Sequence, residues 1–370
     1  MCRSEYYLSN INSFIGSLTL ITVLLITGNN AQANENDELE LYAKVHLSID
    51  MADDDQEKSV GLSNNSSRFG LQGKHRVNIK MAFLWRMEQK VYVDESGGRF
   101  GNPAYAGFEG RLGRVLAGFI DTPYKTFVSK FNVMDDTVAD ARSILSYSPL
   151  GEYEAVNVPA DNMNVRARNA IFYDKEWSSY KLALLYSMER GNEGTTSGMD
   201  DNDEAGISGS LEYKLEKLKL GIAAESWDGG QALQGIRIGG RYEWRGYDFG
   251  LVWEQIESSI NSDYSRDAYA LDVGFNLDEA NRLKIQYLNA EPSDGLPNSD
   301  ASMFSIGSYH KLDNAMSLYL IATSLKNDGN AEYRLGTSGH GDIIAPLAGQ
   351  DVWAISFGLT YKMTKQFRLP

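Results

Sequence analysis

Apolar and polar residues alternate strictly along residues 38–51. The odd positions are apolar (Leu39, Leu41, Ala43, Val45, Leu47, Ile49 and Met51), whereas the even positions include Glu38, Glu40, Lys44, His46, Ser48 and Asp50. A period of two is the period of a β-strand, because successive side chains leave a strand on opposite faces. A strand of this length is sufficient to cross a bilayer, which takes about 9–11 tilted residues. The segment is therefore predicted to be a two-faced strand.

The same alternation recurs over residues 79–88, 180–188, 236–244, 247–254 and 353–363. Several of the apolar faces have Tyr or Trp at their ends, as in the aromatic girdles that lie at lipid headgroups. Charged residues on the opposite face are tolerable only where that face meets water. A soluble sandwich also shows alternation in each strand, but it would pack the aromatic-rich faces together in a core. The recurrence favours a barrel with a lipid-facing outside and a wet inside.

The connections between the predicted strands fall into two length classes that alternate along the chain. Sixteen strands are predicted, at residues 38–51, 68–75, 78–92, 102–110, 113–121, 164–174, 178–189, 204–213, 217–226, 232–244, 247–258, 266–275, 282–290, 300–311, 315–325 and 350–363. Connections after even-numbered strands are short, and those after odd-numbered strands are mostly longer and polar, including 52–67, 190–203, 291–299 and 326–349. Outer-membrane barrels divide their connections in this way, with both termini on the periplasmic side. The predicted fold is all-β: a transmembrane, 16-stranded antiparallel β-barrel.

The N-terminus predicts an export signal. Arg3 precedes an apolar stretch over residues 14–27, which is followed by Ala31-Gln32-Ala33. A basic residue, a short apolar run and an A-x-A site together indicate a secretory signal peptide over residues 1–33. Residues 34–370 are then one barrel domain. The single cysteine, Cys2, lies within the signal, so neither disulfides nor cysteine-bound metals are expected in the mature chain.

Composition and charge exclude several functions. The 21 tyrosines and 35 glycines, against 8 prolines, suit many strands joined by glycine-bearing turns. A formal charge of −15 argues against a nucleic-acid partner, which needs an excess of Lys and Arg to neutralise phosphates. The four histidines lie on separate predicted elements without the spacing of metal ligands or a convincing catalytic partner. We therefore expect no enzymatic activity, no cofactor and no metal.

Several motifs resemble those of the Gram-negative trimeric general porin family, over essentially the whole mature chain. They are Ser67-Arg68-Phe69-Gly70-Leu71-Gln72-Gly73, the hairpin from Ala104 to Val115, the segment from Gly118 to Pro123, and the pattern of Arg166, Asn169, Ala170, Ile171 and Tyr173. The resemblance implies a homotrimer in the outer membrane, in contact with lipid and lipopolysaccharide. It also implies a water-filled channel for passive diffusion of small hydrophilic solutes and ions.

Two positions depart from the family pattern. Asn102 stands where the family often has arginine before its fourth strand, and Phe119 stands where it often has arginine after the fifth strand. Part of the family's basic constriction is therefore expected to be missing.

The longest connection, Thr122 to Met163, is too long for an ordinary hairpin loop. In the family that the chain resembles, this third loop folds into the lumen and narrows the channel. Candidate constriction residues are Asp135, Asp136 and Asp140 on the loop, facing Arg68, Arg86, Arg166 and Arg168 on the wall. Opposite charges on loop and wall would create a transverse field and bias ion selectivity. The alternative is that these aspartates are solvated or cap a short helix over residues 137–144.

The acidic balance and the missing arginines predict a mild cation preference. The main alternative is a substrate-specific channel for a sugar or an anion. A sugar channel should show an aromatic ladder along its lumen, but most aromatics here have lipid-facing parity. A phosphate channel should line its lumen with Lys and Arg. A barrel enzyme or an adhesin is a weaker alternative, which an activity assay or an absence of conductance would reveal.

Overall fold

The computed structural model describes residues 37–93, 98–131, 134–146, 163–189, 205–228, 233–258, 265–337 and 339–368, without the side chains of 98–102. The predicted signal peptide over residues 1–33 lies outside the described residues.

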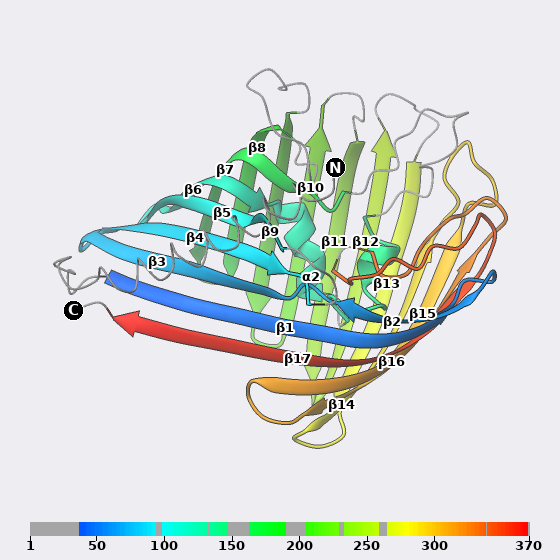
Figure 1. The fold of residues 1–370 in the computed structure, drawn as a ribbon. Helices are drawn as coiled ribbons and strands as arrows, with labels where there is room; N and C mark the ends of the chain where they lie inside the picture. The colour runs from blue at the N-terminus through cyan, green and yellow to red at the C-terminus, as the bar shows by residue number, and fades with distance from the viewer. Residues whose placement is uncertain are drawn as a thin grey trace, which may run out of the picture.

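Antiparallel strands dominate the fold (Figure 1). The strands are β1 (Asp37–Asp53), β2 (Lys58–Asn64), β3 (Arg68–Asn78), β4 (Met81–Val91), β5 (Gly98–Gly110), β6 (Gly113–Asp121), β7 (Arg166–Trp177), β8 (Tyr180–Glu189), β9 (Gly206–Leu215), β10 (Leu218–Trp227), β11 (Leu233–Trp244), β12 (Tyr247–Ser258), β13 (Ser265–Asn276), β14 (Asn281–Ala290), β15 (Ala301–Lys311), β16 (Met316–Asn327) and β17 (Val352–Arg368). From β3 onward each strand pairs with the next, and β17 pairs with β1 along almost its whole length. The sheet therefore closes into a barrel, which leaves no open edge in the bilayer.

The seventeen segments make sixteen barrel strands, because β2 and β3 share one place in the wall. Residues 47–53 of β1 pair with β2, whereas residues 37–44 pair with β3. The interruption lies at residues 65–67, where Ser66 adopts a left-handed conformation with φ of 58°. The predicted 16-stranded antiparallel barrel is confirmed.

Three predicted boundaries were wrong. Residues 52–67, predicted as a long loop, contain the ordered strand β2. The turn predicted at residues 76–77 lies at Ile79 and Lys80, so that Ile79 is fully exposed instead of part of a strand. The last strand continues beyond Met363 to Arg368. Pairing with a neighbour extends these strands past the point where alternation of residue types fades.

The two faces of the wall differ as the alternation predicts. On β1, Ile49 and Met51 are exposed, whereas Ser48 and Asp50 are buried towards the interior. Apolar residues are exposed on the same outward parity of other strands, for example Leu251. Two aromatic clusters lie at short turns of one rim: Trp177, Tyr180 and Tyr213 in one, and Trp244, Tyr247, Phe249 and Phe275 in the other. This arrangement is that of a lipid-facing belt with an interfacial girdle.

Helical structure is scarce in the described part of the chain. It comprises α2 (Pro123–Phe131) and a 3-10 turn, Ala141–Ser143, both in the connection between β6 and β7. Neither of them, nor any other helix among the described residues, has the length and apolar character needed to span a membrane.

Candidate functional site

The connection between β6 and β7 folds into the barrel, where α2 lies against the wall formed by β8 to β12 (Figure 1). The helix starts after Thr122, whose hydroxyl accepts a hydrogen bond from the Lys125 backbone N–H at 3.1 Å. Its apolar residues follow a helical spacing, and Tyr124, Phe127, Val128 and Phe131 are all buried. This third loop therefore occupies the lumen.

Glycines in the wall make room for the helix. A Cβ atom added to Gly221 of β10 would lie 2.6 Å from the Phe127 ring, and one added to Gly239 of β11 would lie 3.0 Å from it. A Cβ atom at Gly235 would lie 2.5 Å from the Tyr124 hydroxyl. Because protein interiors do not tolerate such overlaps, the missing side chains determine where α2 packs.

A fully buried ion cluster lies behind the loop. The Glu254 carboxylate of β12 lies 2.5 Å from the Arg237 guanidinium of β11 and 2.6 Å from the Arg266 guanidinium of β13. All three side chains have no exposed surface. Each charge therefore depends on the others, because an unpaired charge in such a place is very costly.

The same two arginines hold the loop at two points. Arg237 donates a hydrogen bond to the Tyr124 carbonyl at 2.6 Å, and Arg266 donates one to the Ile144 carbonyl at 2.8 Å. The Arg237 guanidinium also lies over the Tyr124 ring, 3.6 Å from its centroid. The loop is thus fixed to β11 and β13 by charge-assisted hydrogen bonds.

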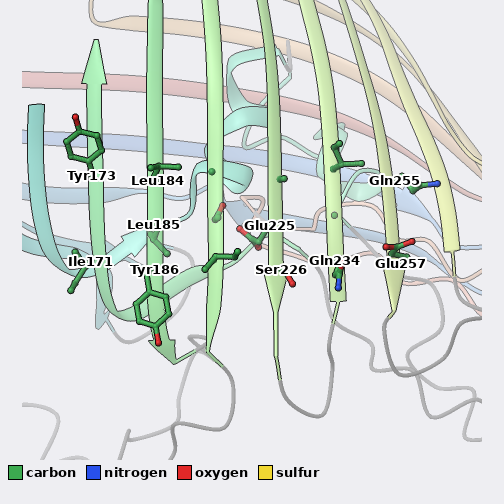
Figure 2. Close-up of a pocket in the computed structure, with 16 residues that line it drawn as sticks. Ile171, Tyr173, Leu184, Leu185, Tyr186, Glu225, Ser226, Gln234, Gln255 and Glu257 are labelled. Atoms are coloured by element: carbon green, nitrogen blue, oxygen red, sulfur yellow. The ribbon is translucent and has the colours of Figure 1, made fainter. Parts of the chain in front are cut away.

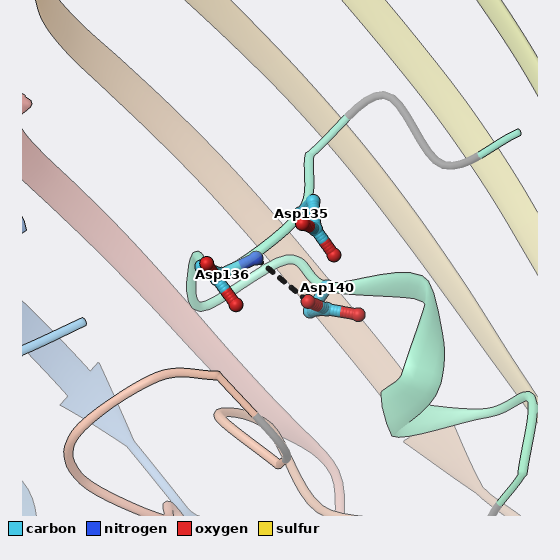
Figure 3. A group of neighbouring side chains, drawn as sticks. All are labelled: Asp135, Asp136 and Asp140. Atoms are coloured by element: carbon cyan, nitrogen blue, oxygen red, sulfur yellow. Dashed lines mark hydrogen bonds between the residues drawn. The ribbon is translucent and has the colours of Figure 1, made fainter. Parts of the chain in front are cut away.

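The three predicted loop aspartates lie together (Figure 3). Arg142 donates hydrogen bonds to Asp135 at 2.7 Å, Asp136 at 3.2 Å and Asp140 at 2.5 Å. Asp140 also accepts hydrogen bonds from the backbone N–H groups of Asp136 and Arg142, at 2.7 and 2.9 Å, and it caps the 3-10 turn. Arg142 therefore balances part of the acidic charge within the loop itself.

The three aspartates differ in their access to water. Their side chains are 37%, 12% and 0% exposed for Asp135, Asp136 and Asp140, respectively. Burial raises the pKa of Asp135, and Arg142 only partly offsets that effect. Burial acts in the same direction on Asp136, but Lys44 and Arg142 outweigh it and hold the pKa of Asp136 below its usual range. Asp135 is thus the most exposed of the three aspartates.

These carboxylates could in principle hold a cation, because one oxygen from each lies within 4.8 Å of the others. The guanidinium of Arg142 contacts all three of them and already supplies the positive charge. The donor set therefore fits an arginine better than a metal ion.

Two of the predicted wall arginines lie near this cluster. The Arg68 guanidinium is 3.9 Å from Asp136 and 3.6 Å from Glu88. Arg86 lies 2.5 Å from Glu88 and donates a hydrogen bond to the Tyr42 hydroxyl at 2.7 Å. Both arginines remain about one-third exposed. They lie on β3 and β4 beside the loop and share the Glu88 carboxylate.

The other two predicted wall arginines flank an irregularity between β6 and β7. The register shifts between Gly118 and Ile120, so alternation alone does not assign a face to Arg166 and Arg168. Arg166 pairs with Asp121 at 2.8 Å, Arg168 lies 3.4 Å from Glu189, and both guanidinium groups lie within 6 Å of the Phe119 ring centroid. Phe119, which replaces an arginine of the family pattern, is thus the surface on which these two arginines stack.

The sequence reasoning missed Lys44, which forms a direct ion pair between wall and loop. Its ammonium lies 2.7 Å from the Asp136 carboxylate. Lys44 occupies a polar position of the first predicted strand, and that parity was the available signal.

A second long connection, residues 328–351 between β16 and β17, also contacts the interior. Thr337 donates a hydrogen bond to Ser143 of the third loop at 3.2 Å. The buried His340 lies 3.0 Å from the Asp50 carboxylate of β1. The sequence predicted only a long polar loop here, because it gives no sign of the direction in which a loop folds.

A groove of about 700 Å³ crosses β7 to β12 (Figure 2). Its rim includes Ile171, Leu184, Tyr186 and Ile207, which are all exposed on the outward parity of their strands. Acyl chains cover such residues in a bilayer, so this groove is part of the lipid-facing belt.

A closed antiparallel barrel with a lipid-facing belt, a charged interior and an inward-folded loop defines an outer-membrane channel protein. A sequence model of the Gram-negative porin family matches residues 19–330. The chain belongs to the Gram-negative porin family, and it is an outer-membrane protein. A search of curated proteins found no match.

Solved porin structures share the fold. The anion-selective porin from Comamonas acidovorans superposes with a TM-score of 0.73 at 18% identity, covering 88% of this chain and 100% of that one. OmpT of Vibrio cholerae superposes with a TM-score of 0.69 at 12% identity, covering 90% of this chain and 99% of that one. OmpF of Salmonella typhi, in complex with daunomycin, superposes with a TM-score of 0.59 at 13% identity, covering 89% of this chain and 99% of that one. At such identities the likeness establishes the fold alone.

Proposed function

We propose that this porin forms a water-filled channel for passive diffusion of small hydrophilic solutes and ions. The observation that carries the proposal is the third loop, which is tied to the wall by the Arg237–Glu254–Arg266 cluster and by Lys44. A loop fixed inside a closed barrel narrows the lumen, and the passage that we propose beside it would set a size limit. Single-channel conductance of the refolded protein tests the proposal, and folded protein without conductance would contradict it.

The constriction that we propose has an acidic and a basic side. Asp135, Asp136 and Asp140 belong to the loop, and Arg68 and Arg86 belong to the wall, with Arg166 and Arg168 further along it. In this arrangement Asp135 meets solutes directly, whereas Asp140 is a positioning residue that holds the loop turn. Opposite charges across a narrow passage orient dipolar solutes.

We retain mild cation preference as part of the proposal. It is supported by the exposure of Asp135 and by the formal charge of −15. Since the pKa of Asp135 is raised, the preference should strengthen as the pH rises through that pKa. Reversal potentials in a planar bilayer under a salt gradient measure it. Asp135→Asn should weaken the cation preference and its pH dependence. A reversal potential of the wild type that indicates anion selectivity would refute the proposed cation preference.

We further propose a homotrimer embedded in lipid and lipopolysaccharide. The proposal is supported by the family and by a solved OmpT of Vibrio cholerae that is described as a trimer form. Native mass spectrometry of the detergent-solubilised protein tests it, and a monomer as the main species would contradict it.

A substrate-specific anion channel is the second candidate. It is favoured by basic residues on β3, β4 and β6, each about one-third exposed: Arg68, Lys74, Arg86 and Arg114. A specific channel shows conductance that saturates with one solute, whereas a general one does not. Measurements over a range of anion concentrations therefore separate the two functions.

A further inference from the structure

A cavity of about 870 Å³ lies on the short-turn rim, between the hairpins β3–β4, β5–β6 and β7–β8. Seven basic side chains line it (Lys74, Arg76, Lys80, Arg111, Arg114, Lys175 and Lys181), against the acidic Glu109, Asp174 and Glu176. Short turns of such barrels face the periplasm. The cavity thus gathers positive charge at the periplasmic rim of a chain whose formal charge is −15.

Two of the acidic residues are already paired. Asp174 accepts two hydrogen bonds from the Arg114 guanidinium, at 2.8 and 2.9 Å, in a bidentate pair. Glu109 is bound by Lys74. Glu109 and Asp174 are therefore neutralised by Lys74 and Arg114, and not by the basic residues of the surrounding turns.

Arg76 is paired with Glu38 at 3.4 Å, so four of the seven cations are left over. Lys80, Arg111, Lys175 and Lys181 form no ion pair with any carboxylate among the described residues, and the remaining acidic residue is Glu176. Lys80 and Arg111 are exposed at their turns, and Lys175 and Lys181 are half-buried beside the third turn. A concave surface lined by one sign of charge concentrates ions of the opposite sign.

We propose that this cavity binds small anions with several charged oxygens, such as phosphate esters or polycarboxylates, at the periplasmic end of the channel. Ammonium and guanidinium groups on three separate hairpins can contact oxygens of one such anion from different sides. The proposal rests on the channel function, because it places a solute site at the mouth of that channel. It is separate from ion preference, which is set at the constriction.

The test uses pyrophosphate and the refolded full-length barrel in bilayers of neutral phosphatidylcholine. Pyrophosphate added to the periplasmic side should cause a concentration-dependent reduction or flicker of single-channel current, and the same addition to the extracellular side should have a weaker effect. Lys80→Gln/Arg111→Gln and Lys175→Gln/Lys181→Gln are made as two separate double variants, so that one folding failure does not end the test. Each should raise the half-blocking concentration about threefold or more, since exposed charge contacts are individually weak.

The matched control is Lys214→Gln/Lys217→Gln, which removes two lysines next to the β9–β10 turn on the same rim but outside the cavity. This variant should keep the wild-type response. Equal block by pyrophosphate added to either side, or the same loss of block in the control variant, would overturn the proposed site. So would competition by anionic phosphatidylglycerol in the bilayer, since that result would assign the cavity to lipid headgroups.

Titration calorimetry of the detergent-solubilised protein with pyrophosphate measures binding independently of conduction. Heat of binding that is lost in both double variants supports the site even if the barrel does not conduct, so a failed channel and a failed site give different results. Absence of binding heat and of current block in the folded wild type would overturn the proposal.

Discussion

The Lys44 ammonium of β1 lies 2.7 Å from the Asp136 carboxylate of the third loop, and both side chains are only 12% exposed. This contact joins the first strand of the barrel to a loop that follows β6, the fifth of the sixteen barrel strands. Two other attachments also hold the loop: the packing of α2 against wall glycines, and the hydrogen bonds from the buried arginines of β11 and β13. Perturbing each of these attachments separately should have a distinct effect on the channel.

The Lys44–Asp136 pair should stabilise the docked loop. Asp136→Asn removes the carboxylate that Lys44 pairs with. The loop should therefore fluctuate more, and open-channel current noise should rise. In a double-mutant cycle with Lys44→Met, the coupling free energy should be about 1–3 kcal/mol, as for charged hydrogen bonds shielded from water. Thermal unfolding followed by gel mobility supplies the energies. A coupling near zero would show that the pair does not hold the loop.

Glu254→Gln should destabilise the barrel strongly. The substitution leaves Arg237 and Arg266 without a counter-charge in a place with no exposed surface, which costs about 3–5 kcal/mol. Urea unfolding in lipid vesicles measures the loss. Glu257→Gln is the control, because Glu257 is exposed on the same strand. Equal stability of the two variants would contradict a structural role for the cluster.

Gly221→Val should displace α2 from the wall. The new side chain would begin 2.6 Å from the Phe127 ring, and such overpacking typically costs about 1–3 kcal/mol. Single-channel conductance should change, with more than one conductance level as the helix moves away from the wall. Gly240→Val on the adjacent strand is the control and should change conductance less, because the nearest atom there belongs to the flexible Leu220 side chain at 3.3 Å. Wild-type conductance in Gly221→Val would contradict the packing of α2 against Gly221.

The connection of residues 328–351 should dock more firmly in mild acid than in alkali. Burial lowers the pKa of His340, but its hydrogen bond and ion pair with Asp50 outweigh that effect and raise the pKa above its usual value. A raised histidine pKa adds stability that is complete below about pH 6.5, the unfolded value, and disappears as the pH rises through the folded pKa. Hydrogen exchange of residues 328–351 should therefore accelerate with rising pH beyond the intrinsic trend.

His340→Gln is the matching variant for that measurement. It removes the titrating group and keeps a polar side chain of similar size, so the additional pH dependence should vanish. If it persists, another group controls the docking of this connection.

Some site residues could be predicted because their side chains follow a local rule. Arg68 and Arg86 lie on the polar parity of their strands, as β-geometry requires. Arg166 and Arg168 obey the same rule in sequence, but the shift between Gly118 and Ile120 interrupts it. A bulge depends on the partner strand, so a single strand's pattern does not reveal it.

The residue pattern alone predicts the strands, their two faces and hence the barrel, because a period of two and a lipid-facing belt are local properties repeated many times. Which charges contact one another becomes visible only in the folded chain. Arg142 binds three aspartates of its own loop, and Arg237 and Arg266 share Glu254 from the two strands next to it. Lys44 and Asp136 are 92 residues apart and meet only because the third loop folds into the barrel.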